Sequence, residues 1–195
     1  MLYIIRHGET AKNKKKLLQG RSDQPLNDKG LKQSAEAGKF FRAEGIIFDH
    51  VYSSPLIRAV QTAGQILGED SDRITIDDRL IEMDYGPYEG MDLEHPAPEV
   101  MAFFMDFAGT RAPEGMEQLE EVTARLGDFL EDIIEEARSG NVLISTHAIA
   151  MKGALEYLTP ESKGSYWSEY IGNCDVYAAE VTDSGYGIPY PLKQR

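Results

Sequence analysis

The sequence predicts an α/β fold, a doubly wound three-layer α/β/α sandwich built on a mostly parallel sheet. Short apolar runs, such as residues 2–5 and 142–144, alternate with longer segments whose apolar residues recur every three or four positions. The short runs are typical of strands buried on both faces, and the longer segments have the period of one helix face. Strands that alternate with helices in this way indicate βαβ units, which place their strands parallel in one sheet.

Several segments are expected to form strands because each is short and either continuously apolar or alternating. They are residues 2–5, 46–52, 73–77, 141–146 and 176–181. Residues 11–26 are rich in turn-forming side chains and are expected to be a loop. The chain from Ser184 onward contains closely spaced prolines and glycines and is expected to be mostly irregular.

The first two helices are recognised by their end signals. One is expected to follow Asn27, a good N-cap residue, and to stop near Gly45. The next is expected to have Ser54 as its N-cap and Pro55 in its first helical position, and to end at Gly68.

The clearest helical pattern runs from Met116 to Ala137, where apolar residues form one continuous stripe. The opposite face of this segment is acidic, which is typical of a solvated helix face and does not indicate a metal site. A shorter helix is expected over 151–158, because Pro160 cannot continue it.

Residues from about 84 to 115 are interrupted by glycines and prolines, and we interpret them as a small cap-like excursion. The length of the chain suits one domain, so the excursion is expected to belong to a single domain over 1–195. A short helix over 99–107 is expected to carry an aromatic cluster. The cluster consists of Phe103, Phe104 and Phe107. These rings are expected to pack the excursion, with a pocket-lining role as the alternative.

Composition excludes some classes of function. The chain has 195 residues, is 42% hydrophobic and carries a formal net charge of −13. That charge argues against nucleic-acid and anionic-membrane surfaces, although a local positive pocket for a small anion stays compatible with it. Cys174 is the only cysteine, so no internal disulfide is possible. With neither a signal-peptide pattern nor an apolar run of spanning length, a cytoplasmic location is expected.

No cofactor motif is present in the sequence. There is no cysteine pair, no His-Glu-x-x-His pattern, no Walker loop and no dinucleotide-binding fingerprint. Neither a metal nor an organic cofactor is therefore expected. The oligomeric state stays open between a monomer and a homodimer.

Two of the predicted strands are followed by a histidine, His7 after the first and His147 after the fourth. The carboxyl ends of parallel strands open on one crevice, so the two imidazoles are expected to meet there. A lone histidine after a strand is more often an ordinary loop residue. Two such residues, with Arg6 beside one of them, favour a functional site.

Arg58 is expected in the first turn of the helix that follows the second strand, near the same edge of the sheet. Guanidinium groups match phosphate oxygens, and helix N-termini favour anions. Arg6, Arg58 and a helix end therefore predict a site for a phosphate dianion. The alternative for Arg58 is an ordinary surface ion pair.

These residues lie in motifs that, in order, resemble those of the histidine phosphatase superfamily, also called phosphoglycerate mutase-like. The Arg6-His7-Gly8-Glu9-Thr10 run resembles its signature. The other similar segments, in chain order, are Asn13, the block 19–30, the block 53–63, the block 80–90, Thr146-His147 and Asn173-Cys174. The resemblance implies the phosphoglycerate mutase-like fold, with an antiparallel edge strand on the parallel sheet.

The resemblance also implies roles for individual residues. His7 would attack phosphorus and form a phosphohistidine, and Glu82 would act as the acid and then the base. Arg6, Arg58 and His147 would stabilise charge on the transferring phosphoryl group. Further phosphate or substrate contacts are expected from the segment after the first strand and from the residue after the second histidine. These contacts are Asn13, Gln19, Gly20, Arg21 and Ala148.

The sequence departs from the family pattern at two places. Ala148 stands where the family usually has glycine, which costs nothing if φ is negative and about 1 kcal/mol if φ is positive. The block around Glu82 lacks the Glu-Arg-His-Tyr-Gly sequence of the family's mutases, and the excursion after Gly86 is short.

The departures around Glu82 and in the excursion favour hydrolysis over mutase activity. With the mechanism that the resemblance implies, the sequence thus predicts a metal-independent phosphomonoesterase that acts on a small phosphorylated metabolite. A cofactor-dependent phosphoglycerate mutase-type phosphotransferase is the alternative within the family. A non-catalytic protein that binds phosphate ligands is the alternative of another class, and it is disfavoured because every expected catalytic residue is present. The identity of the substrate stays open.

Overall fold

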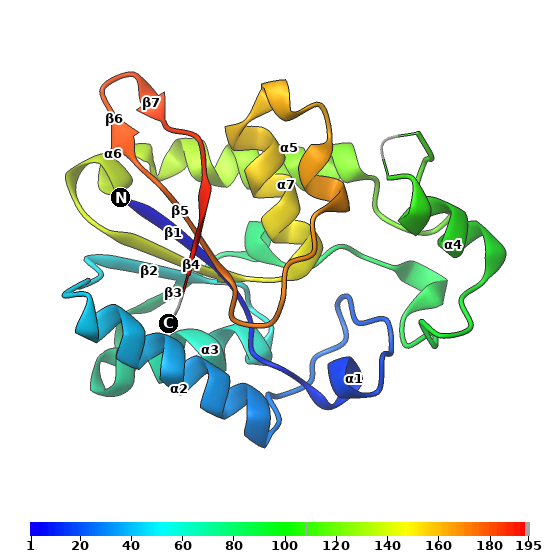
Figure 1. Ribbon diagram of the computed structural model, residues 1–195, viewed down its shortest axis with the longest axis horizontal. Coiled ribbons are helices and arrows are strands. Elements are labelled where there is room, and N and C mark those ends of the chain that lie inside the picture. Colours follow the sequence, from blue (N-terminus) through cyan, green and yellow to red (C-terminus); the bar gives the residue numbers. More distant parts are fainter. Residues whose placement is uncertain (108, 194–195) are drawn as a thin grey trace.

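The computed structural model describes residues 1–107 and 109–193, and it has a mixed six-stranded sheet at its centre (Figure 1). The strand order is β3-β2-β4-β1-β5-β8. The strands are β1 Leu2–Arg6, β2 His50–Ser53, β3 Ile74–Ile76, β4 Val142–Thr146, β5 Val176–Ala179 and β8 Tyr190–Leu192. β1 to β4 are parallel, and β5 runs antiparallel to β1 and to β8. The predicted mostly parallel sheet with an antiparallel strand toward one edge is confirmed.

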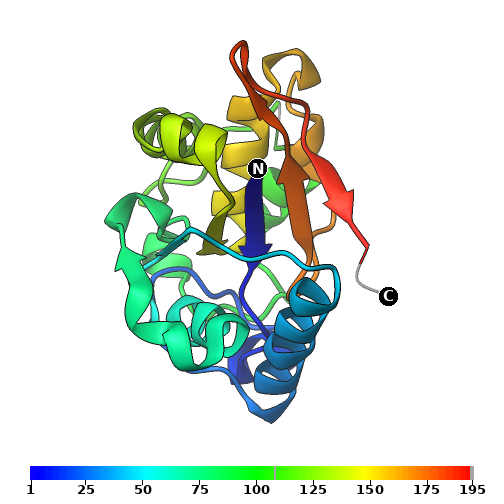
Figure 2. The ribbon, with the colours of Figure 1, turned by 90° about the vertical axis from the view of Figure 1, so that its left-hand side faces the viewer.

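Helices cover both faces of the sheet, as Figure 2 shows. On one face, α2 (Asp28–Ala43) and α3 (Ile57–Leu67) pack on alternate strand residues such as Ile5. On the other face, α5 (Leu119–Asp132) and α7 (Ala148–Leu158) pack on the intervening residues, such as Ile4. This alternation is the period of a strand buried on both sides, and it produces the predicted three layers.

Two helices begin or end away from their predicted positions. Ser54 is not the N-cap of α3: the helix begins at Ile57 with Leu56 as its N-cap, and the Ser54 hydroxyl accepts from the Leu56 N–H at 3.3 Å and contacts His147. The stripe predicted over 116–137 is broken. α5 begins after Gln118, which forms a capping box with Glu121, and it stops before Ile133. α6 (Ile134–Ser139) then continues the chain.

Other differences are local. The loop predicted over 11–26 contains a short helix, α1 (Ala11–Lys14), because Thr10 and Asn13 form a capping box. α7 begins at Ala148, three residues before its predicted start. The strand predicted over 46–52 begins only at His50 and ends at Ser53, as β2.

The tail predicted as irregular forms a hairpin and a further strand. The hairpin consists of β6 (Val181–Thr182) and β7 (Gly185–Tyr186). β8 follows and pairs with β5. Because β8 contains Pro191 and pairs through only three residues, its own sequence pattern is too weak to indicate a strand.

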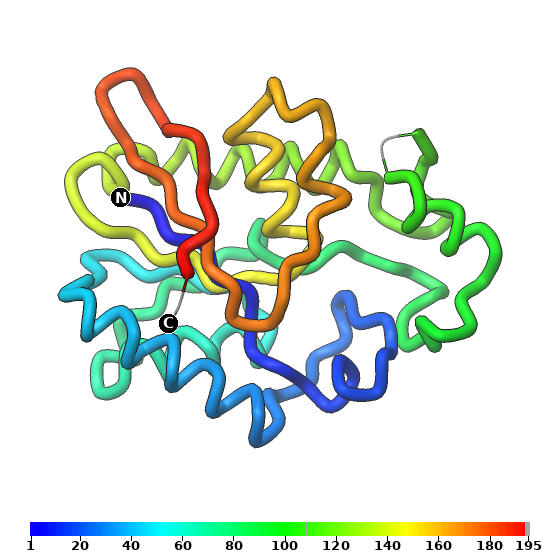
Figure 3. The backbone as a smooth tube through the Cα atoms, in the orientation of Figure 1, coloured from blue at the N-terminus to red at the C-terminus, as the bar shows by residue number. Residues whose placement is uncertain are grey.

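The predicted excursion over 84–115 lies at one end of the molecule, beside the segment that carries α1 (Figure 3). It contains η3 (Gly86–Tyr88) and α4 (Pro98–Met105). Residue 108 of the excursion and residues 194–195 of the predicted domain lie outside the described residues. Phe103 is fully buried, and its ring centroid lies 5.7 Å from that of Phe104 and 4.9 Å from that of Phe107. The cluster therefore packs the excursion.

Within the part of the chain that the structure describes, none of the helices has both the length and the apolar character that crossing a membrane requires.

Candidate active site

His7 and His147 lie side by side at the carboxyl edge of the sheet. β1 and β4 are adjacent and in parallel register, with Arg6 opposite Thr146, so the next residue of each strand emerges at the same place. The two ring centroids are 5.1 Å apart. Both side chains are buried, with exposed fractions of 3% for His7 and 0% for His147. The topology thus brings together two residues that are remote in sequence.

Arg58 joins the two histidines. It lies in the first turn of α3, and its Nε is 3.2 Å from His7 Nε2 and 3.1 Å from His147 Nδ1. Its terminal nitrogens donate to the carbonyls of Ser22 and Gly20. Arg58 is completely buried, so the alternative of an ordinary surface ion pair is wrong.

These contacts define the tautomer of His7. Arg58 Nε can only donate, so His7 Nε2 must accept and carries a lone pair. The proton is on Nδ1, which donates to the Gly8 carbonyl at 2.7 Å. Burial lowers the pKa of His7 well below its usual value, and the positive charges of Arg58 and Arg6 lower it further. His7 is therefore neutral at pH 7, with its Nε2 lone pair directed into the site.

His147 has the opposite proton arrangement. Its Nδ1 accepts from Arg58, so the proton is on Nε2, which donates to Ser54 Oγ at 2.7 Å. Burial, followed by the charge of Arg58, lowers the pKa of His147 well below its usual value. The sequence predicts Ser54 as a helix cap within the family-like block 53–63, and no local pattern distinguishes a cap serine from one that contacts a histidine.

Glu82 lies at the N-terminus of α7. Its exposed fraction is 3%, and its carboxylate accepts from the backbone N–H groups of Ile149 at 3.2 Å and Ala150 at 3.0 Å. The Met83 N–H also donates to it, at 2.9 Å. A helix N-terminus stabilises a carboxylate through its free N–H groups and its dipole. Glu82 is therefore held in place by the same helix that follows His147.

Ala148 is compatible with this arrangement. It is the first residue of α7, and the described non-glycine residues with positive φ are Lys16, Lys163 and Cys174. Ala148 thus has an ordinary helical conformation, and its methyl group causes no backbone strain.

Two buried N–H donors at the site have no hydrogen-bond partner among the described residues. They are Arg6 Nε and Gln19 Nε2. Arg6 precedes His7 and donates through Nη1 to the Ile171 carbonyl, whereas Gln19 accepts from Thr10 Oγ1 at 2.6 Å. A buried donor without an acceptor costs about 1–3 kcal/mol. Unpaired donors beside a histidine pair indicate a site suited to the oxygens of an anion.

The remaining predicted contact residues have supporting or peripheral positions. Asn13 Oδ1 accepts from Thr10 N at 3.2 Å and from Asn173 Nδ2 at 3.3 Å, and Asn173 also donates to the His7 carbonyl. Gly20 donates its N–H to Glu89 at 2.9 Å. Arg21 is an exposed residue that pairs with the carboxylate of Asp84 at 3.2 Å.

Over residues 1–107 and 109–193, no group of three or more histidine, cysteine, aspartate or glutamate side chains is arranged to hold a metal ion.

A mostly parallel α/β sheet with paired histidines and arginines at its carboxyl edge is the arrangement expected of an enzyme that transfers phosphoryl groups. A family model described as histidine phosphatase superfamily (branch 1) matches residues 2–189. The chain therefore belongs to the histidine phosphatase superfamily, as its motifs predicted.

Similar proteins include both phosphatases and mutases. The chain is 45% identical over 137 residues to fructose-2,6-bisphosphatase TIGAR of Xenopus tropicalis, covering 67% of this chain and 48% of that protein. It thus spans about half the length of this relative. It is 30% identical to a 2,3-bisphosphoglycerate-dependent phosphoglycerate mutase of Bradyrhizobium diazoefficiens, covering 83% of each chain.

Solved structures confirm the fold. YhfR of Bacillus stearothermophilus matches with a TM-score of 0.82 and 27% identity, covering 96% of this chain and 94% of that one. A phosphoserine phosphatase of Entamoeba histolytica in complex with 3-phosphoglyceric acid also has a TM-score of 0.82. The two sequences are 23% identical, and the match covers 98% of this chain and 94% of the phosphatase, so it supports the fold alone.

The lowered pKa values of His7 and His147 predict that mild acid destabilises the protein. As the pH falls below about 6.5, the unfolded chain binds protons at these histidines that the folded chain does not bind. The free energy of unfolding should therefore decrease in this window, by up to about 1.4 kcal/mol per pH unit for each histidine. Urea unfolding between pH 7.5 and 5 measures this slope.

A His147→Gln variant provides the comparison, because it removes one of the two groups. Its slope should be shallower than that of the wild type in the same window. A wild-type stability that stays constant or rises as the pH falls below 6.5 contradicts the assignment of neutral buried histidines.

Proposed function

We propose that the protein is a metal-independent phosphomonoesterase that acts through a phosphohistidine on a small phosphorylated metabolite. The observation that carries this proposal is His7 itself, a buried neutral imidazole whose Nε2 lone pair lies 3.2 Å from the Arg58 guanidinium. A nucleophile and a positive group at one point fit the attack on an anionic phosphorus centre.

In the first step, His7 Nε2 attacks phosphorus and the bond from phosphorus to the ester oxygen breaks. Protonated Glu82 gives its proton to that oxygen, so an alcohol leaves and a phosphohistidine remains. Arg6 and Arg58 offset the charge on the equatorial oxygens, and the unpaired Arg6 Nε supports this role. His147 joins them as a neutral donor once its Nε2–H turns from Ser54 to a phosphoryl oxygen.

In the second step, Glu82 takes a proton from water and the oxygen of that water attacks phosphorus. The bond to His7 Nε2 breaks, and inorganic phosphate is the product. The N–H groups of α7 hold the Glu82 carboxyl group in position for this step. One carboxyl group thus carries the proton in both steps.

The excursion over 84–115 is proposed to set the substrate specificity of a single domain, because it lies beside the segment that carries Gln19, Gly20 and Arg21. Backbone bonds from Leu18 to Met91 and from Gly90 to Leu18, each at 2.8 Å, join the two segments. A phosphotransferase of the mutase type is the second candidate, since one of the similar proteins is a phosphoglycerate mutase.

A panel of phosphorylated metabolites, with 4-nitrophenyl phosphate included, tests the proposal in the presence of EDTA. We expect release of inorganic phosphate at an unchanged rate in EDTA. Loss of that release in EDTA, or no release from any compound, overturns metal-independent hydrolysis. Rapid formation of 2-phosphoglycerate from 3-phosphoglycerate with a trace of 2,3-bisphosphoglycerate would show the mutase reaction instead.

A further inference from the structure

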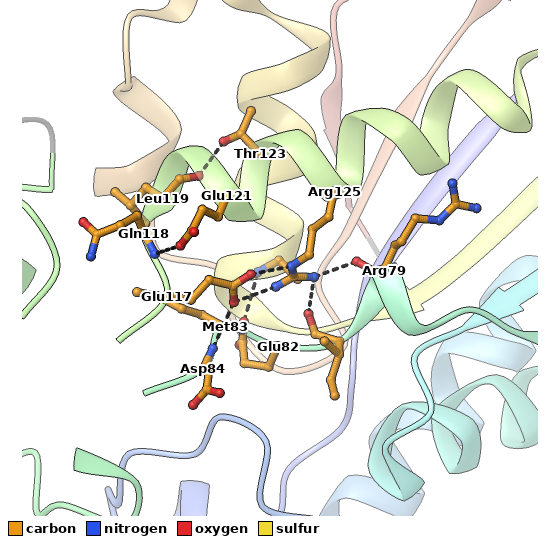
Figure 4. A network of polar contacts seen from close by, with 12 residues as sticks. Arg79, Glu82, Met83, Asp84, Glu117, Gln118, Leu119, Glu121, Thr123 and Arg125 are labelled. Atoms are coloured by element: carbon orange, nitrogen blue, oxygen red, sulfur yellow. Dashed lines mark hydrogen bonds and ion pairs between the residues drawn. The ribbon is translucent and has the colours of Figure 1, made fainter. Parts of the chain in front are cut away.

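We propose that Glu117 and Arg125 are positioning residues that hold Glu82 in place for proton transfer to the leaving group. This inference rests on the proposed function, because it takes Glu82 as the acid. Neither residue contacts either histidine in the described contacts. The sequence pattern places Glu117 on the solvated acidic face of its segment and gives Arg125 no role, whereas the Glu117 side chain is only 10% exposed. Figure 4 shows both side chains beside the segment that carries Glu82.

The segment around Glu82 has little regular structure of its own. A single 3₁₀ turn, η2 (Asp78–Leu80), precedes it, and the next turn begins only at Gly86. Arg125 Nη1 donates to the carbonyl of Arg79 and to the carbonyl of Ile81, each at 2.6 Å. The second of these carbonyls belongs to the residue directly before Glu82, so Arg125 fixes the backbone on that side.

Glu117 fixes the other side. Its Oε2 accepts from the Asp84 N–H at 3.0 Å, and its own N–H donates to the Asp84 carbonyl at 2.9 Å. Glu117 and Arg125 also form a two-pronged ion pair, with 2.7 Å from Nε to Oε1 and 3.2 Å from Nη2 to Oε2. The pair thus brackets Glu82 by holding Ile81, one position before it, and Asp84, two positions after it.

The pair has the properties of a rigid support. The side chains of Arg125 and Glu117 are only 16% and 10% exposed, so solvent screens them weakly. Paired guanidinium and carboxylate groups are directional as well as strong. An ion pair on an exposed surface is screened by solvent and contributes little to rigidity.

The two ends of Glu82 are thus held by two packed helices. Arg125 lies on α5 and supports the Glu82 backbone, whereas the N-terminus of α7 binds its carboxylate. α5 and α7 approach so closely that a Cβ on Gly153 would lie 2.9 Å from Val122. The carboxyl group is therefore placed by contacts at both ends rather than by its own flexible segment.

Leaving-group dependence tests this role. The enzyme and its Arg125→Met, Arg125→Lys and Glu117→Gln variants are compared on glycerol phosphate and on 4-nitrophenyl phosphate. An alkoxide leaving group needs a proton, whereas 4-nitrophenolate leaves without one. General acid catalysis contributes about 100-fold or more. We expect kcat for glycerol phosphate to fall 10- to 100-fold in each variant, kcat for 4-nitrophenyl phosphate less than threefold, and both KM values to stay within twofold.

Arg125→Lys separates position from charge, because lysine keeps the positive charge but cannot form the two-pronged contact. Its kcat for glycerol phosphate should fall as far as that of the Arg125→Met variant. Glu117→Gln keeps the size of the side chain and provides a second route if Arg125→Met fails to fold. Arg138→Met is the matched control, since Arg138 lies on α6, where it pairs with Glu135 and donates to the Thr182 carbonyl of β6, away from Glu82. Its two reactions should be unchanged.

The outcomes distinguish this inference from the proposed function. Equal losses on both substrates, or no loss on either, in variants that fold overturn the positioning role while the wild type still hydrolyses both. A Glu82→Gln variant that loses equal activity on glycerol phosphate and on 4-nitrophenyl phosphate overturns the inference, because Glu82 is then not the acid. A wild type that hydrolyses neither substrate overturns the proposed function itself.

Discussion

Replacement of His7 by alanine is expected to reduce kcat by about 10⁴-fold or more on every substrate, because it removes the nucleophile. The fold should survive, since among the described residues the His7 side chain bonds only to the Gly8 carbonyl and to Arg58, and Arg58 keeps its contacts with Gly20 and Ser22. Phosphate release measures the loss of activity, and thermal unfolding with circular dichroism measures the fold.

His95→Ala is the matched control for this experiment. His95 is an exposed histidine that pairs with Asp92 at 2.9 Å, and its side chain is 83% exposed. The control variant should retain wild-type activity. If His7→Ala keeps activity within tenfold of the wild type, then His7 is not the nucleophile.

Arg58→Met is expected to have the second large effect, a fall in kcat/KM of about 10²- to 10³-fold together with a loss of stability. The substitution removes the positive group beside His7 and leaves the carbonyls of Gly20 and Ser22 without their donor. Each lost hydrogen bond costs about 1–3 kcal/mol where its partner stays buried. Urea unfolding and steady-state kinetics measure the two effects separately.

The same substitution should also change the pH dependence. The Arg58 charge contributes to the lowered pKa of His7, after burial, so its removal raises that pKa. The acid side of the kcat/KM profile should then move to higher pH in the variant. Arg73→Met is a suitable control, because Arg73 also donates to two carbonyls, those of Phe48 and Asp49, but away from the site. An Arg58→Met variant with wild-type kinetics contradicts the proposed role.

The fold was predictable because its main signals are local. A strand buried on both faces must be apolar throughout, so residues 2–5 and 142–144 stand out in the sequence. Parallel topology then requires the side chains at their carboxyl ends to meet, which is how His7 and His147 are brought together. β8 lacks such a signal, since a short edge strand with a proline depends on its neighbour β5 for its structure.

The support of the site was less predictable, because it depends on contacts between segments remote in sequence. Ser54 has the pattern of a helix cap, yet its hydroxyl accepts from His147. Glu117 and Arg125 lie in a stretch whose apolar stripe predicted one long helix. Their side chains instead stabilise the irregular segment around Glu82, through Asp84 and Ile81. The helix itself begins only at Leu119. Periodicity reports which face of a segment is buried, and it carries no information about polar partners.

Trapping the covalent intermediate tests the central claim most directly. The enzyme is mixed with a phosphorylated substrate that it hydrolyses, quenched in alkali, digested and analysed by mass spectrometry. The account predicts one phosphorylated site, His7, whose label is stable in base and lost in acid. A label on a serine or a carboxylate, or no label at any time during continuing turnover, would contradict the phosphohistidine mechanism.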